Sequence, residues 1–150
     1  MQRDEFGNLT EWGGVLEKLE ELKRAGGLDE HQMGLARLVR FRGNPKLREA
    51  ALTYCREISE ASDLLIAEAL NTLADEDTPL RLRVMAADAL GHLLPRYSTG
   101  AASPFDIDRA SEIMAQVAAR VQPPVLAEAV ERALAAAGGT GEAAPVPAME

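Results

Sequence analysis

Apolar residues recur along most of the chain at intervals of three and four positions, the spacing that places them on one face of an α-helix. Residues that cap or stop helices separate these stretches. The pattern therefore predicts about seven helices. Their expected starts are, in order, Thr10, Asp29, Asn44–Pro45, Ser62 or Asp63, Thr78–Pro79, Ser103–Pro104 and Pro123–Pro124.

The same pattern divides the chain into three parts. We expect a flexible N-terminus over residues 1–9 and a helical domain over residues 10–137. A disordered tail is expected over residues 138–150, where GGTGEAAPVPAME has no periodicity and several helix breakers. Within the helical domain, Trp12 and Tyr54 are expected to lie in the core.

The helices headed by proline repeat one another. A shift of 35 residues superposes Leu47–Arg48 on Leu82–Arg83 and Ala51 on Ala86, and a shift of 44 superposes Leu82 on Leu126. A pair of amphipathic helices cannot bury its apolar face alone, so repeated pairs stack on their neighbours and form one continuous core. We expect consecutive helices to pair and the pairs to stack.

Residues 65–93, LIAEALNTLADEDTPLRLRVMAADALGHL, resemble the HEAT-repeat family, especially its short bacterial forms. That family combines an apolar helix ending in Leu-x-Asp, an acidic turn, and a second helix of the pattern Val/Leu-Arg-x-x-Ala-x-x-Ala-Leu-Gly. The positions that carry the repeat in this chain are Pro45, Leu47, Ala51, Asp75, Pro79, Leu82, Arg83, Ala86 and Leu90.

The resemblance implies an all-α fold, a right-handed α-solenoid of about three HEAT-like helix pairs plus a final helix. It implies a protein that binds other macromolecules, usually proteins, and not a particular reaction. It also implies that Asp75 bonds Arg83 or backbone amides, as the family's aspartate and arginine do.

Composition narrows the class of protein. The chain has 150 residues, 47% of them hydrophobic and 4% aromatic, and its formal charge is −8. The length and the hydrophobic fraction suit one domain. No apolar run is long enough to span a bilayer, and MQRDEFGN is acidic where a signal peptide is basic, so we expect a cytoplasmic protein. The negative charge opposes binding to nucleic acid or to an anionic membrane, so we expect neither as a partner.

Signatures of catalysis and cofactor binding are missing from the sequence. It contains no GxSxG, HExxH, GxxxxGK[ST] or GxGxxG pattern, which predicts a protein that is not an enzyme and holds no cofactor. We expect no metal site, because His31 and His92 lack ligands at suitable spacing. Cys55 is expected to be a small buried hydrophobe. The acidic turn 75–77 lacks the glycine and distant glutamate of a calcium loop and is expected to complement the next helix N-terminus.

Positive charge is concentrated in residues 37–48, which hold five basic side chains and no acidic one. One interpretation is that these cations offset the negative end of a helix dipole. The other is a patch that reads anions, because the guanidinium fork suits carboxylates and phosphates. The candidate partner contacts are Arg37, Arg40, Phe41, Arg42, Lys46, Arg48 and Arg83.

The leading hypothesis is a non-catalytic protein–protein interaction module, such as an adaptor, scaffold or regulatory subunit. It would bind an acidic or mixed-charge partner on one helical face. The alternative is a HEAT-like nucleic-acid-binding or base-acting protein, which requires a broader basic groove. A third hypothesis, an accessory or lyase-type protein acting on a chromophore or cofactor, draws only on the resemblance to phycobilisome lyase subunits. The ends of the helical stack are candidate surfaces for self-association.

Overall fold

The computed structural model describes residues 6–97, 107–120 and 123–142 of the chain. In these ranges the structure is all-helical, with seven α-helices and no β-strand. The helices are α1 (Trp12–Ala25), α2 (Gln32–Arg40), α3 (Pro45–Tyr54), α4 (Asp63–Ala74), α5 (Leu80–Leu93), α6 (Ile107–Ala119) and α7 (Pro124–Glu142). The expected all-α class and the expected number of about seven helices are therefore confirmed for the described residues.

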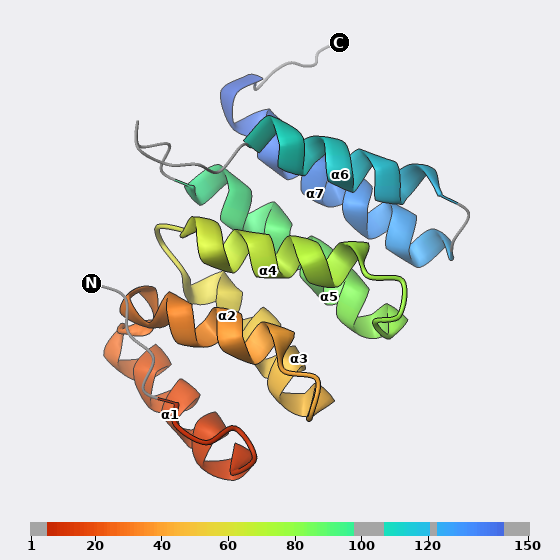
Figure 1. The fold of residues 1–150 in the computed structure, drawn as a ribbon. Coiled ribbons are helices and arrows are strands. Elements are labelled where there is room, and N and C mark those ends of the chain that lie inside the picture. Colours follow the sequence, from red (N-terminus) through yellow and green to blue (C-terminus); the bar gives the residue numbers. More distant parts are fainter. Residues whose placement is uncertain (1–5, 98–106, 121–122, 143–150) are drawn as a thin grey trace.

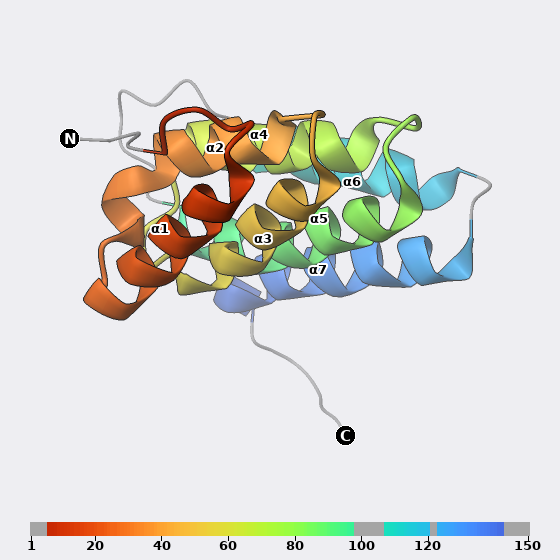
Figure 2. The same cartoon turned by 90° about the horizontal axis from the view of Figure 1, so that it is seen from below.

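The helices form two layers (Figures 1 and 2). Helices α2, α4 and α6 lie side by side in one layer, and α1, α3, α5 and α7 lie side by side in the other. Each helix of the first layer packs on the helix that follows it in the chain. Leu47, Leu82 and Leu126, which the sequence shifts superpose, are all buried at corresponding places in α3, α5 and α7. The core lies between the two layers.

Two of the expected helix starts are capped by the residues that the sequence indicates, and a glycine ends the first helix. Asn44 Oδ1 accepts a hydrogen bond of 2.8 Å from the Lys46 backbone N–H, and Pro45 opens α3. Ser62 Oγ accepts one of 3.2 Å from the Leu65 N–H at the start of α4. Gly26 ends α1 with a φ of 73°, a left-handed conformation that glycine adopts without strain.

At three other boundaries the expected capping side chain bonds elsewhere. The Thr10 hydroxyl donates to Asn8 Oδ1 at 2.8 Å, and α1 begins two residues later. The Asp29 carboxylate accepts from the backbone N–H groups of residues 59 and 60, and a short 3₁₀ helix (Leu28–His31) precedes α2. The Thr78 hydroxyl donates to Asp75 at 3.1 Å, and α5 begins at Leu80. The expected start at Ser103–Pro104 lies outside the described residues.

The structure also differs from the expected domain limits. Phe6 and Leu9, from the segment expected to be flexible, are buried. Phe6 packs edge-on against the ring of His31, because no helix precedes α2 in its layer to cover that side. At the other end α7 continues to Glu142, five residues into the expected tail, since extending a formed helix costs far less than starting one. Trp12 is 48% exposed and is not a core residue, because it lies in the first turn of the terminal helix.

Candidate functional site

The segment before α1 and the α2–α3 and α4–α5 connections lie in a row along one edge of the molecule (Figures 1 and 2). Helices α2 and α4 end at this edge, and α1, α3 and α5 begin there. We call it the turn edge and define it by residues 7–11, 41–44 and 75–79. It brings the basic cluster of the sequence next to a part of the chain that lies some thirty residues earlier.

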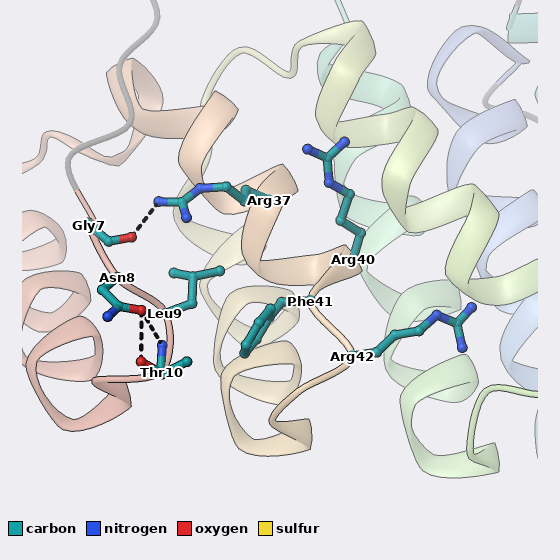
Figure 3. Close-up of a pocket in the computed structure, with 8 residues that line it drawn as sticks. All are labelled: Gly7, Asn8, Leu9, Thr10, Arg37, Arg40, Phe41 and Arg42. Atoms are coloured by element: carbon teal, nitrogen blue, oxygen red, sulfur yellow. Dashed lines mark hydrogen bonds between the residues drawn. The ribbon is translucent and has the colours of Figure 1, made fainter.

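An open hollow of about 550 Å³ lies at the turn edge between the N-terminal segment and the end of α2 (Figure 3). Four residues of the predicted contact set line one side of it, and four residues that precede α1 line the other. We call it the basic hollow and define it by Gly7, Asn8, Leu9, Thr10, Arg37, Arg40, Phe41 and Arg42.

Local hydrogen bonds hold the N-terminal side of the basic hollow in place. Gly7 has a φ of +70°, a conformation that side chains disfavour, and turns the chain. Asn8 Oδ1 then accepts hydrogen bonds from both the N–H and the hydroxyl of Thr10 (Figure 3). Arg37 Nη2 donates to the Gly7 carbonyl oxygen at 3.1 Å and ties this segment to α2.

Phe41 supplies the apolar wall of the basic hollow. Helix α2 ends at Arg40, and Phe41 takes an extended conformation, so its half-buried ring stands between α2 and the N-terminal segment (Figure 3). The ring folds over Gly43, where an added Cβ would lie 2.5 Å from the ring Cζ. Glycine at this position therefore leaves room for the ring.

The guanidinium groups of Arg40 and Arg42 point away from the hollow and toward the next helix pair (Figure 3). Arg40 forms an ion pair of 3.5 Å with Glu68 of α4, and Arg42 bonds Asp75 at the following turn. The two arginine side chains are 62% and 66% exposed. Their partner carboxylates are only 14% and 25% exposed, so the arginines, and not Glu68 and Asp75, are the accessible side of each pair.

Two residues of the predicted contact set lie inside the protein. Arg48 is 5% exposed and its Nε donates to the Val39 carbonyl at 2.6 Å, while Arg83 is 8% exposed and its Nε donates to the Leu73 carbonyl at 2.8 Å. Each arginine thus satisfies a carbonyl in the last turn of the preceding helix. Burial, followed by the nearby charge of Arg42, lowers the pKa of Arg48.

The bond that the family resemblance implies between Asp75 and Arg83 does not form, because Arg83 points at the Leu73 carbonyl. The Asp75 carboxylate accepts instead from Arg42, from the Asp77 N–H and from the Thr78 hydroxyl. These bonds, the one to Arg42 foremost, lower the pKa of Asp75. The implied bond to a backbone amide is therefore present, but the cation belongs to the preceding helix pair.

Similar ion pairs, which the sequence pattern does not indicate, join other consecutive helix pairs. They link Arg81 to Glu49 at 3.4 Å, Arg132 to Asp88 at 3.2 Å and Arg120 to Glu76 at 3.1 Å. Lys46 is exposed but does not line the basic hollow. These ion pairs join residues more than thirty positions apart, and no local pattern indicates them. The spacing of three between the apolar residues Phe6 and Leu9 is the one local signal for the N-terminal side of the basic hollow.

The cysteine and the two histidines, which could serve in catalysis or metal binding, lie among backbone carbonyls or in the core. Cys55 is fully buried, as expected, and burial raises the pKa of its thiol to about 12. His31 is buried at the N-cap position of α2, and its Nδ1 lies 3.1 Å from the Gly27 carbonyl oxygen. His92 Nε2 lies 3.0 Å from the Ile58 carbonyl. Within the described ranges, no group of three or more His, Cys, Asp or Glu side chains is arranged to hold a metal ion.

The chain has no match among protein-family models, curated proteins or solved structures. Over the part of the chain that the structure describes, no helix has both the length and the hydrophobicity needed to cross a bilayer. The basic hollow combines one aromatic wall, Phe41, with three arginines in its lining, of which Arg40 and Arg42 turn their guanidinium groups toward the next helix pair.

Proposed function

We propose that this protein is a non-catalytic interaction module, an α-solenoid of HEAT-like helix pairs that binds an acidic or mixed-charge segment of another protein in the basic hollow. The alternation of helices between two layers and the recurrence of Leu47, Leu82 and Leu126 support the solenoid. The basic hollow supports the binding site.

The observation that carries the proposal is the meeting of Phe41 with Arg37, Arg40 and Arg42 around one open hollow. Aromatic residues and arginine are the side chains that contribute most at protein interfaces. An apolar side chain of the partner would pack on Phe41. Acidic side chains beside it would form ion pairs with the arginines that now face Glu68 and Asp75.

The pairing of these arginines favours a protein over a nucleic acid. A protein that binds nucleic acid must neutralise several phosphates at once with its cations. Here Glu68 and Asp75 already pair with two of the three guanidinium groups. The net charge of −8 adds a repulsive field around the site. A short acidic segment needs only the local positive charge.

Capture of partners from native lysate on the immobilised full chain tests the proposal. The double variant Arg40→Glu/Arg42→Glu should recover at least about tenfold less of the partner that the wild type recovers, because both rim charges are reversed. The matched control Arg81→Glu/Arg132→Glu also breaks two exposed ion pairs between helix pairs but lies away from the hollow. It should recover the partner fully.

Equal recovery by all three proteins would exclude the basic hollow as the binding site. Capture that disappears when the lysate is treated with nuclease would identify the partner as nucleic acid and overturn the proposal.

A further inference from the structure

A smaller cavity of about 100 Å³ adjoins the basic hollow, and Arg40 and Arg42 line both. Arg48 and Thr72 line its inner part, and Glu68 and Asp75 complete it. We propose that this cavity is a carboxylate subsite, which binds an acidic side chain of the partner next to the apolar residue held in the basic hollow. The inference rests on the proposed function and specifies the chemistry of the partner.

Arg48 contributes to this cavity a guanidinium group whose position is fixed by a backbone hydrogen bond. Its Nε is fixed by the Val39 carbonyl, and Nη2 makes only a long contact of 3.4 Å with Thr72 Oγ1. A guanidinium carries five N–H donors, so Arg48 keeps donors for an incoming oxygen. The Thr72 hydroxyl donates to the Glu68 carbonyl at 2.9 Å, which fixes the wall opposite.

The net charge of the side chains around the cavity can be balanced by one negative charge. Three guanidinium groups face two carboxylates, those of Glu68 and Asp75, which leaves one positive charge uncompensated. A carboxylate would neutralise it. A phosphate monoester, with a charge of about −1.5 to −2 at pH 7, would leave the cavity negative and would be repelled by the two carboxylates already present. The balance of charges therefore selects a carboxylate.

The adjacency of the two cavities sets the kind of segment that fits. An extended peptide rises about 3.3 Å per residue and turns alternate side chains to the same side. A segment with an apolar residue and an aspartate two positions apart therefore presents both side chains on one side and can fill the basic hollow and the smaller cavity together. The apolar group would contact Phe41, and the carboxylate would reach Arg48 between Arg40 and Arg42.

Nuclear magnetic resonance titration of the ¹⁵N-labelled full chain tests this inference. The probes are end-capped peptides that contain Leu and Asp as neighbours or separated by one or two Gly, the same peptides with Asn for Asp, and inorganic phosphate. The backbone amide of Gly43 reports on the basic hollow and the Nε–H of Arg48 on the smaller cavity. We expect one Asp peptide to shift both signals at up to about 5 mM, and its Asn counterpart to bind about tenfold more weakly.

Two variants locate the effect. Asn71 lines the cavity from α4, and Asn71→Glu would place a competing carboxylate there and abolish the preference for Asp. Gln116 occupies the corresponding exposed position three residues before the end of α6. Gln116→Glu adds the same charge outside the cavity and should leave the preference unchanged.

Each other outcome has a defined meaning. Equal binding of the Asp and Asn peptides at the hollow would overturn the carboxylate subsite but leave the proposed function in place. The same holds if no peptide shifts either signal while capture from lysate still depends on Arg40 and Arg42. Phosphate that shifts Arg48 more strongly than any Asp peptide does would overturn the charge argument. Loss of both peptide binding and that dependence would overturn the proposed function as well.

Discussion

At the scale of single residues, the repeat places two arginines in the same structural role, but their hydrogen bonds differ. Arg48 and Arg83 each donate through Nε to a carbonyl near the end of the preceding helix. Arg48 Nη2 also reaches the Thr72 hydroxyl, whereas Arg83 Nη2 is buried without a hydrogen-bond partner among the described residues. Val117 stands on α6 where Thr72 stands on α4, two residues before the last, and it offers no side-chain acceptor.

This difference predicts unequal costs for the same substitution. Arg48→Met should lower the free energy of unfolding by about 2–3 kcal/mol, because it leaves the buried Val39 carbonyl without its donor. Arg83→Met should cost about 1 kcal/mol less, since it also removes a buried nitrogen that has no partner. Urea unfolding of both variants measures the difference. An equal or larger cost at Arg83 would contradict the assigned roles.

Burial also decides the chemistry of Cys55. Because burial raises the pKa of its thiol to about 12 from the ordinary 9.0, the native protein holds almost no thiolate at pH 8. We expect Ellman's reagent to modify Cys55 only as fast as the protein unfolds, and full reaction within seconds in denaturant. Stability should also fall as the pH rises above 9, where the unfolded thiol ionises and the native one does not. Fast modification of the native protein would show that the thiol is accessible.

At the scale of helices, α5 and α7 pack closely at Gly91. An added Cβ at Gly91 would lie 3.1 Å from the Ala133 Cα and 3.3 Å from its Cβ, so the small residues of both helices allow them to pack tightly. At Gly14, in α1, an added Cβ would have no atom within 4 Å. The two glycines therefore serve as a matched pair for the packing of α7.

Opposite effects on stability are expected from substitutions at these two glycines. Gly91→Val should destabilise the protein by about 1–3 kcal/mol, because the backbone of α7 must move away from α5. Gly14→Ala should stabilise it by about 0.5–1 kcal/mol through helix propensity alone. Thermal and urea unfolding measure both. A neutral Gly91→Val variant would mean that α7 is loosely packed on α5.

At the scale of the whole molecule, the sequence predicts the helices better than their contacts. The periodic apolar stripe and caps such as Asn44 and Ser62 are local signals, and they identified the helices and the all-α class. The burial of Phe6 and Arg48 depends on which helix lies alongside, and local patterns carry no such information. The partners of Arg40 and Arg42 lie some thirty residues later, which is why the basic cluster looked more strongly charged in the sequence than it is in the fold.

The arrangement of the whole chain makes the basic hollow a composite site. Its two sides come from residues 7–10 and 37–42. The sequence pattern indicates the second side as a basic cluster, whereas the first lies in the segment expected to be flexible. The basic hollow forms because Phe6 and Leu9 are buried and anchor the N-terminal segment on the helical stack.

Site-specific photo-crosslinking tests the central claim, that a partner protein docks in the basic hollow, most directly. Thr10 is an exposed residue on its rim, and Glu131 is an exposed residue on α7, away from it. A benzoylphenylalanine placed at position 10 in the full chain should crosslink a partner protein in native lysate, and the same group at position 131 should not. The crosslink should disappear when Arg40→Glu and Arg42→Glu are introduced. A partner that crosslinks equally from both positions, or that still crosslinks from position 10 after the charge reversal, would contradict the account.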